Sequence, residues 1–305
     1  MTLPGVTPYT SFDFVLVGNP VAHSLSPVMH NACYRDLAKE SPAFSRWNYH
    51  AIHCEDENSA SFEMSLVRTG KYWGMNVTMP YKRLALAQAD FADAQADAAG
   101  GANVLVRHND FKIYAYNTDG AGAAGAIERV TGKSISDART IVCGTGPTAA
   151  AIAVAFAQAG AEQVALVSRE RARSRSCITR AQTSLEEDEG NRLQAMDYAN
   201  IDSIVPKADI IVDATPRGMQ PDDEAIIDTG LLHQGQVVLD TVYGHGVTAL
   251  VAGAQEQGAF AMDGLEMLVE QAALSVEIWA DAMMIDVHVD RNVMRNAASG
   301  AQHRI

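Results

Sequence analysis

The stretch that decides the fold is Ile141-Val-Cys-Gly-Thr-Gly-Pro-Thr-Ala149. A short apolar run that begins at Thr140 leads directly into it, and an alanine-rich run to Ala159 follows and ends at Gly160. These patterns predict a strand, a tight glycine turn and a helix. In that setting the spacing Gly-x-Gly-x-x-Ala is typical of a dinucleotide-binding loop, because a pyrophosphate can sit on the helix N-terminus.

Each small residue of this spacing has a physical reason. Gly144 permits the turn, Gly146 lets backbone N–H groups approach the pyrophosphate, and Ala149 lets the helix pack close to its strand. Pro147 removes one backbone donor but suits the first turn of a helix. The alternative is a plain packing turn between strand and helix. We expect the cofactor to contact Gly144, Thr145, Gly146, Pro147, Thr148 and Ala149.

The rest of the second half indicates the same fold class. Strands alternate with helices over residues 130–262, which predicts an α/β domain with a doubly wound parallel sheet. The strand after the glycine turn ends at Ser168, and Arg169 and Arg173 follow it closely. Arginines at that strand tip favour a 2′-phosphate and therefore NADP, although Glu170 weakens the inference.

The length and charge of the chain bound its function. With 305 residues, two domains are expected. The 23 Lys and Arg residues against 37 Asp and Glu residues give a net charge of −14. So acidic a protein is unsuited to nucleic acid or an anionic membrane, and we expect small-molecule ligands held by local donors. No run approaches the roughly 18 apolar residues of a membrane span, and the N-terminus lacks a signal-peptide pattern.

The cysteines and histidines indicate neither disulfides nor a metal site. The four cysteines are scattered without Cys-x-x-Cys spacing, which fits a reducing cytoplasm. His50, His53 and Cys54 stand close together, but no second pair of ligands has matching spacing. We therefore expect no metal and a cytoplasmic location.

The first 120 residues also alternate between strands and helices. We expect strands over residues 12–18, 47–53, 72–79, 99–107 and 112–116. Helices are expected over residues 28–39, 59–69 and 121–130, and another is expected to begin at Tyr81. A long amphipathic helix is expected over residues 265–282, and the tail after Asn296 is expected to be frayed.

Four polar residues stand beside the predicted helix starts. Ser26 precedes Pro27 and is expected to cap a helix, with Ser24 in the loop before it. Lys82 lies in a first helical turn, where its charge opposes the helix dipole. Asp119 is either a helix cap or an active carboxylate. Taken locally, these patterns favour capping for the serine and the aspartate, and an exposed position for the lysine.

Several stretches together resemble the shikimate dehydrogenase family, over nearly the whole chain from Gly18 to Trp279. The stretches are Gly18-Asn-Pro-Val-Ala-His-Ser-Leu-Ser-Pro27, Gly74-Met-Asn-Val-Thr-Met-Pro-Tyr-Lys82, Gly101-Ala-Asn103, Asn117-Thr-Asp-Gly120, Asp213-Ala-Thr-Pro-Arg-Gly-Met219 and Asp263-Gly-Leu-Glu-Met-Leu-Val-Glu-Gln271. Members of this family reduce 3-dehydroshikimate to shikimate with NADPH in aromatic amino-acid biosynthesis. The resemblance implies a substrate-binding domain over residues 1–120, completed by helices in 264–305, and a Rossmann-type cofactor domain over residues 121–263.

The resemblance also implies roles for single residues, with the ligand in a cleft between the domains. Lys82 and Asp119 match the family's catalytic pair, and a lysine ammonium can supply charge and a proton to the alkoxide that hydride transfer creates. Further matches are Ser24 and Ser26, with Tyr243 near them, for the substrate carboxylate, and Thr78, Asn103 and Gln271 for the ring hydroxyls. We also expect cofactor contacts at Ser168, Arg169, Arg173, Thr215 and Gly264.

Departures from the family pattern leave alternatives open. Val104 replaces the usual threonine after Asn103, which leaves room for an altered substrate. Pro147 replaces a common glycine and Ser168-Arg-Glu170 replaces the usual Asn-Arg-Thr, so both NADP and NAD stay open. The alternatives are an NAD-preferring quinate/shikimate dehydrogenase and a non-catalytic relative that senses a shikimate-like ligand. A bare nucleotide-binding module ranks last because it gives the N-terminal motifs no purpose. A monomer or a homodimer is expected.

Overall fold

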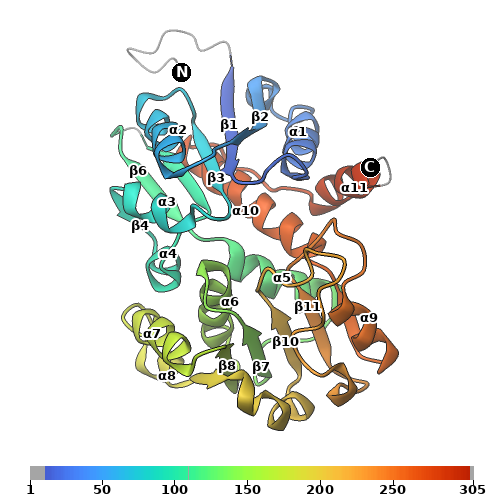
Figure 1. The fold of residues 1–305 in the computed structure, drawn as a ribbon. Coiled ribbons are helices and arrows are strands. Elements are labelled where there is room, and N and C mark those ends of the chain that lie inside the picture. Colours follow the sequence, from blue (N-terminus) through green and yellow to red (C-terminus); the bar gives the residue numbers. More distant parts are fainter. Residues whose placement is uncertain (1–10, 109, 303–305) are drawn as a thin grey trace. The chain divides into compact units, whose positions relative to one another are not determined.

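The computed structural model describes residues 11–108 and 110–302, and the chain divides into two compact units (Figure 1). The first unit is formed by Met1–Phe91, Asn103–Ala115 and Ala272–Ile305, and the second by Ala92–Ala102 and Tyr116–Gln271. The described residues form two six-stranded sheets. The assignment of residues 1–120 and 121–263 to two functional domains stays a prediction.

The first sheet has the strand order β2-β1-β3-β5-β6-β4. Its strands are β1 Phe12–Gly18, β2 Trp47–His53, β3 Gly74–Val77, β4 Phe91–Ala92, β5 Val104–Arg107 and β6 Ile113–Tyr116. β1 runs parallel to β2 and to β3, whereas β3 runs antiparallel to β5. The strands expected over residues 12–18 and 47–53 are confirmed, and those expected over 72–79 and 99–107 are shorter than the sequence indicated.

Helices at both ends of the chain pack in the first unit. They are α1 Ser26–Leu37, α2 Glu57–Thr69, α3 Lys82–Gln88 and α11 Arg291–Gln302, with the 3-10 turn η1 Pro42–Arg46. α11 packs against α1 and buries Met294 and Ala298 completely. The expectation of a frayed tail after Asn296 is therefore wrong as far as residue 302, because an apolar face holds this polar helix in place. Residues 303–305 lie outside the described part of the chain.

Trp279, on α10 (Leu265–Ala282), anchors the core of the first unit. It is fully buried and stacks on Phe14 of β1, with ring centroids 4.7 Å apart. Its indole N–H donates to the carbonyl oxygen of Leu105 on β5 at 3.2 Å. Gly74 makes room for it, because a Cβ at that position would collide with the indole ring. The end of α10 is thereby fixed against three strands of the first sheet.

The second unit contains the doubly wound parallel sheet that the sequence predicts. Its strands are β7 Arg139–Cys143, β8 Gln163–Ser168, β9 Leu193–Asp197, β10 Ile210–Asp213, β11 Val237–Asp240 and β12 Phe260–Met262. They lie in the order β12-β11-β10-β7-β8-β9, and every neighbouring pair is parallel. The strand order reverses at β7 and β10, and ligands of Rossmann folds bind beyond the carboxyl ends of strands at such a point. β9 was not expected from the sequence.

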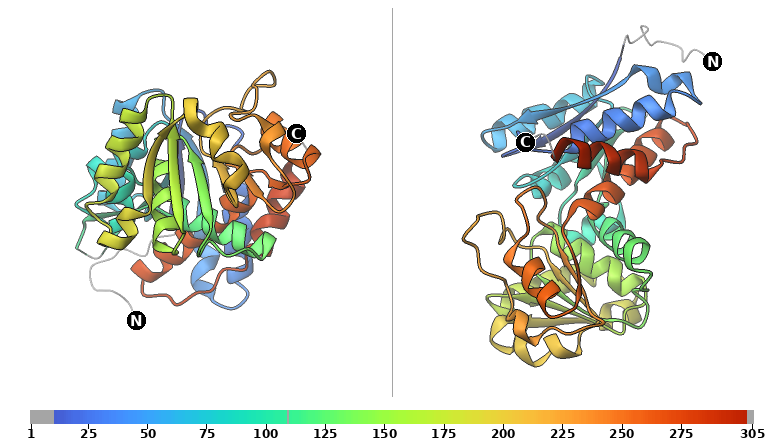
Figure 2. Two further views of the ribbon diagram at one scale, coloured as in Figure 1. Left: turned by 90° about the horizontal axis from the view of Figure 1, so that it is seen from below. Right: turned by 90° about the vertical axis from the view of Figure 1, so that its right-hand side faces the viewer.

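Alternate side chains of this sheet enter two separate apolar layers. The helices of the unit are α4 Ala94–Ala99, α5 Asp119–Thr131, α6 Pro147–Gln158, α7 Arg171–Ala181, α8 Glu187–Asn191 and α9 Ala249–Glu256, with 3-10 turns η2 Tyr198–Ser203, η3 Val205–Lys207 and η4 Thr229–Leu231. On β7, Val142 packs with α5, α6 and α7, whereas Ile141 and Cys143 pack with η2, η3 and α9. Figure 2 shows helices on both faces of the sheet.

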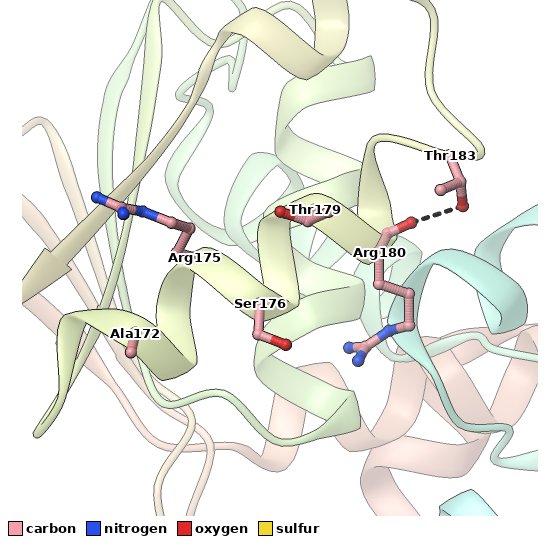
Figure 3. Close-up of a pocket in the computed structure, with 6 residues that line it drawn as sticks. All are labelled: Ala172, Arg175, Ser176, Thr179, Arg180 and Thr183. Carbon is pink, nitrogen blue, oxygen red and sulfur yellow. Dashed lines mark hydrogen bonds between the residues drawn. The ribbon is translucent and has the colours of Figure 1, made fainter.

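Arg180 ties α7 to α4. Its guanidinium donates to the carbonyl oxygens of Ala98 and Ala99, at 3.3 and 3.0 Å. α4 ends at Gly100, where φ is +66° and where a Cβ would meet the Arg180 side chain. Residues 99–103 are therefore a helix end and a turn, and not the beginning of the expected strand. Figure 3 shows Arg180 among the residues that line an open groove along α7, namely Ala172, Arg175, Ser176, Thr179, Arg180 and Thr183.

The described part of the chain shows no helix with both the length and the apolar composition of a membrane span. Nor do residues 11–108 and 110–302 gather three or more histidine, cysteine or acidic side chains in the manner of a metal site.

Candidate active site

One edge of the first sheet carries several of the polar residues singled out above. β1 and β3 are parallel, so their carboxyl ends lie at the same edge, and the antiparallel β5 begins there. The Thr78 N–H donates to the carbonyl oxygen of Val17 at 2.9 Å, and the Val77 N–H donates to that of Asn103 at 2.8 Å. Thr78 and Asn103 therefore flank the ends of neighbouring strands. Asn103 is also almost fully buried.

The two serines lie at the start of α1, just beyond β1. The helix begins at Ser26 itself, and the N-cap residue is Leu25, which makes no side-chain cap. The Ser24 hydroxyl accepts the Ser26 N–H at 3.2 Å. The expectation that Ser26 caps the helix is wrong, because Ser26 is already the first helical residue and Leu25 stands at the N-cap. Both hydroxyls stand at a helix N-terminus, which favours an anionic ligand.

Lys82 is the first residue of α3 and is half-buried. The preceding Tyr81 fixes its position, because the Tyr81 N–H donates to the Thr78 carbonyl at 3.0 Å and its hydroxyl donates to that of Cys54 at 2.8 Å. The helix dipole opposes a cation at this position. The prediction that Lys82 lies in a first helical turn is confirmed. The alternative of a fully exposed lysine is wrong, because the side chain is half-buried.

A buried amide that the sequence did not single out supports Asn103 from behind. The Asn76 side chain accepts the Tyr49 hydroxyl at 2.8 Å and donates to the Asn103 carbonyl at 3.2 Å and to the Ser275 hydroxyl at 2.9 Å. All four residues are buried, so this network is a positioning element. An asparagine within an apolar strand is the signal that could have pointed to Asn76. Tyr49 and Ser275 had no such signal.

Asp119 begins α5 in the second unit and is only 4% exposed. The N-cap residue is Thr118, and the Asp119 N–H is taken by the Asn117 side-chain oxygen at 3.0 Å. The Asp119 carboxylate accepts the hydroxyl of Thr148 at 2.9 Å. Asp119 is thus not a helix cap, and its carboxylate is directed toward the start of α6.

Close helix packing brings α5 against α6 and against Gln271 of α10. A Cβ at Gly120 would collide with the carbonyl oxygen of Ala151 on α6, and a Cβ at Gly122 would press on the Gln271 side chain. The Thr118 hydroxyl donates to the Gln271 carbonyl at 3.2 Å. The missing side chains of two glycines therefore allow α5 to contact both α6 and α10.

The glycine turn has the geometry that the sequence predicts. Gly144 has φ +118°, and its N–H donates to the Val167 carbonyl at 2.8 Å. Gly146 is the N-cap of α6, Pro147 starts the helix, and Ala149 is fully buried against the sheet. No atom lies within 4 Å of the place where a Gly146 Cβ would stand, so the helix N-terminus is open to an approaching group. These residues fit a bound pyrophosphate.

The tip of β8 is only partly exposed. Ser168 is buried, and its hydroxyl donates to the Glu170 carbonyl and pairs with the Ser174 hydroxyl, each at 2.8 Å. Arg169 and Arg173 are exposed. Arg173 forms an ion pair with the Glu170 carboxylate at 3.4 Å. An incoming phosphate would therefore have to compete with Glu170 for Arg173.

Two carboxyl groups are buried at the ends of β10 and β11. Asp213 accepts the N–H of Thr215 at 2.8 Å, and burial raises the pKa of its carboxyl to about 7. Asp240 accepts the Thr248 hydroxyl at 2.7 Å, and burial raises its pKa as well. Sequence reasoning noted Asp213 only as part of a motif and did not expect its pKa to be raised.

Gly264 and Tyr243 follow β12 and β11 in the second unit. A Cβ at Gly264 would collide with the Thr241 carbonyl, and the Gly264 N–H donates to the Val242 carbonyl at 3.0 Å. Tyr243 is half-buried. Of the residues singled out from the sequence, the first unit holds Ser24, Ser26, Thr78, Lys82 and Asn103, and the second holds Asp119, Tyr243, Gln271 and the cofactor candidates including Thr145.

Comparison with known proteins decides the family. Residues 16–105 match the model of the shikimate dehydrogenase substrate binding domain, and residues 264–298 match that of the shikimate 5′-dehydrogenase C-terminal domain. Shikimate dehydrogenase (NADP(+)) of Methanothermobacter thermautotrophicus is 33% identical over 87% of this chain and 89% of its own length. The same enzyme of Bacillus cereus is 30% identical over 87% and 91%. The chain belongs to the shikimate dehydrogenase family.

A solved structure of a family member extends the likeness to three dimensions. Shikimate 5-dehydrogenase of Thermus thermophilus, in complex with NADP(H) and shikimate, has a TM-score of 0.78 and 26% identity, and the match covers 95% of this chain and 99% of that one. The resemblance inferred from the motifs is therefore confirmed, and so is the α/β fold with a Rossmann-type domain. The roles of single residues stay predictions.

Proposed function

We propose that this member of the shikimate dehydrogenase family is an NADP-dependent shikimate dehydrogenase, which interconverts 3-dehydroshikimate and shikimate in aromatic amino-acid biosynthesis. The observation that carries the proposal is the match to relatives named shikimate dehydrogenase (NADP(+)) over 87% of the chain. Lys82 and Asp119 match the catalytic pair of that family, and each stands at a helix start in this chain, which supports a role for each in the chemistry.

The proposed chemistry divides between a cation and a carboxylate. NADPH supplies the hydride when it is bound. The Lys82 ammonium stabilises the negative charge that develops on the ketone oxygen and donates a proton to it. The Asp119 carboxylate accepts a hydrogen bond from a substrate hydroxyl and so orients the ring. Shikimate oxidation reverses these proton movements.

The substrate is proposed to be held by hydroxyl and amide groups. Ser24 and Ser26 donate to its carboxylate, where the N-terminus of α1 adds a favourable dipole. Tyr243 acts beside them. The ring hydroxyls are bound by Thr78, Asn103 and Gln271, and the buried Asn76 network keeps the Asn103 backbone in place.

The cofactor is proposed to lie on the N-terminus of α6. The glycine turn from Gly144 to Ala149 holds the pyrophosphate, and the open space at Gly146 supports this. The donors are its backbone N–H groups other than that of Gly144, which bonds to Val167, and Pro147, which has none. Arg169 and Arg173 receive the 2′-phosphate of NADP, and Ser168 joins them when its hydroxyl releases the Glu170 carbonyl. The remaining contacts are proposed at Thr215 and Gly264. The enzyme is proposed to act in the cytoplasm as a monomer or homodimer, on small molecules and not on nucleic acid.

Initial rates with shikimate and quinate, each with NADP and with NAD, test the proposal. We expect the highest kcat/KM for shikimate with NADP. A higher value for quinate with NAD would instead identify a quinate/shikimate dehydrogenase, an outcome to which the Glu170–Arg173 pair and Val104 would contribute. Binding of shikimate without turnover in any combination would identify a non-catalytic relative.

A further inference from the structure

The hydroxyl of Thr148 lies between the cofactor loop and the carboxylate of Asp119. Thr148 stands in the first turn of α6, directly after the glycine turn. Its hydroxyl donates to the Asp119 carboxylate at 2.9 Å. Asp119 is only 4% exposed, so this bond is sheltered from water and is stronger than one on the surface.

The Thr148 hydroxyl has too few protons for the cofactor contact expected of it. A threonine hydroxyl has a single proton to donate. While that proton is given to Asp119, the hydroxyl has no donor for a phosphate oxygen. A pyrophosphate on this helix would then depend on backbone N–H groups, which the glycine turn exposes at Gly146.

The surrounding packing makes this bond a fixed feature of the second unit. Gly120 brings α5 against Ala151 of α6, one turn beyond Thr148. The Asp119 N–H is held by the Asn117 side chain at 3.0 Å, and Asn117 is itself tied to the Gly101 carbonyl at 2.7 Å. The backbone of Asp119 is thus set by Asn117, and the direction of its carboxylate by Thr148.

We propose that Thr148 is a positioning residue whose hydroxyl orients the catalytic carboxylate of Asp119, and that this hydroxyl is not a ligand of the cofactor phosphates. The inference rests on the proposed function, because Asp119 is catalytic only in that reaction. The start of α6 then has two roles. Its backbone N–H groups bind the cofactor, and the Thr148 side chain orients the Asp119 carboxylate, which in turn orients the substrate.

Thr148→Val tests the proposal, because valine has nearly the same shape but no hydroxyl. We expect kcat for shikimate to fall roughly tenfold, which corresponds to about 1.4 kcal/mol, while the Kd for NADP changes less than about threefold. Thr148→Ser keeps the donor and is expected to restore kcat to within about twofold of the wild type. A higher Kd for NADP with an unchanged kcat would overturn the proposal and make Thr148 a cofactor ligand.

Thr140→Val is the matched control. Thr140 is a buried threonine of β7 whose hydroxyl donates to the Gln163 carbonyl at 3.2 Å. Removing that hydroxyl perturbs the same unit but no proposed catalytic group, so kcat should stay at the wild-type value. An equal loss of kcat in both valine variants would show a general effect of packing and would overturn a specific role for Thr148.

A double-mutant cycle with Asp119→Ala separates this inference from the proposed function, because alanine has no oxygen to accept the Thr148 hydroxyl. In the Asp119→Ala background, Thr148→Val should lower kcat by less than about twofold. The urea midpoints of the same four proteins report the coupling of the two side chains without any turnover, and they should be non-additive. Additive midpoints would overturn the Thr148–Asp119 contact, whereas absence of wild-type turnover would overturn only the proposed reaction.

Discussion

At the scale of single residues, Lys82 occupies a position that its proposed role in the reaction requires but that does not favour the stability of its helix. A cation in the first turn of α3 is unfavourable to the helix dipole. We expect Lys82→Ala to lower kcat by about 10²–10⁴-fold, as loss of a general acid does, and to leave the melting temperature unchanged or slightly higher. Steady-state kinetics and circular dichroism measure the two effects.

The adjacent Arg83 provides the control for Lys82. It is exposed on the same helix, so Arg83→Ala should keep kcat near the wild-type value. A folded Lys82→Ala enzyme with wild-type kcat would contradict the proposed role of the lysine.

Asp213 gives the stability of the protein a distinct pH dependence. Burial raises the pKa of its carboxyl from 3.8 to about 7, so the folded protein binds a proton that the unfolded chain releases. This contribution is fully present below about pH 4 and is lost as the pH rises through 7. The stability that Asp213→Asn gains over the wild type should therefore grow between pH 5 and pH 8, by at most about 3 kcal/mol. Urea unfolding at several pH values measures it, and parallel pH curves for the two proteins would contradict the raised pKa.

At the scale of elements, the sequence predicted those helices, strands and turns whose conformation is set by their own local residue pattern. β7, the glycine turn and α6 were identified because an apolar run, a glycine spacing and an alanine-rich run each specify their own conformation. The local patterns favoured caps at Ser26 and Asp119, yet Leu25 and Thr118 stand at the N-caps of α1 and α5. Residue type alone does not decide at which of two neighbouring residues a helix begins.

Elements held by distant contacts were harder to predict. α11 is polar and follows a loop, and only burial of Met294 and Ala298 reveals why it persists to residue 302. The support of Asn103 by Asn76 and Ser275 joins residues far apart in sequence. Motifs could therefore name the residues of the candidate site, but they could not name the ones that position them.

The packing of α5 on α6 leads to a prediction about two glycines of one helix. A Cβ at Gly120 would collide with the Ala151 carbonyl, whereas a Cβ at Gly125 would meet its nearest atom, in Glu270, at 3.7 Å. We expect Gly120→Ala to destabilise the protein by about 1–3 kcal/mol, as overpacking does. Gly125→Ala should be neutral or stabilise it by up to about 1 kcal/mol, because alanine favours helix. Urea unfolding compares them, and equal effects would contradict the close contact of α5 with α6.

At the scale of the whole molecule, an acidic chain is proposed to bind two anions. Its net charge of −14 repels both NADP and shikimate at long range. Binding must therefore come from short-range donors at helix starts, namely the serines of α1 and the N–H groups of α6. The affinity for NADP and shikimate should then depend on a few positions at these helix starts, where a substitution can weaken binding without unfolding the protein.

Gly146 is the position at which binding and folding separate most clearly. Its φ of −73° suits any residue, and no atom lies within 4 Å of an added Cβ. Gly146→Ala should therefore cost no more than about 1 kcal/mol, as a weaker N-cap. NADP at a hundred times its Kd should stabilise the wild type by about 2.7 kcal/mol, and the variant by much less, because a methyl group keeps the pyrophosphate from the N–H groups. Gly300→Ala, on α11 and equally unobstructed, is the control that should keep the full stabilisation. Thermal unfolding with and without NADP measures all three proteins, and an undiminished gain in Gly146→Ala would place the cofactor away from this helix start.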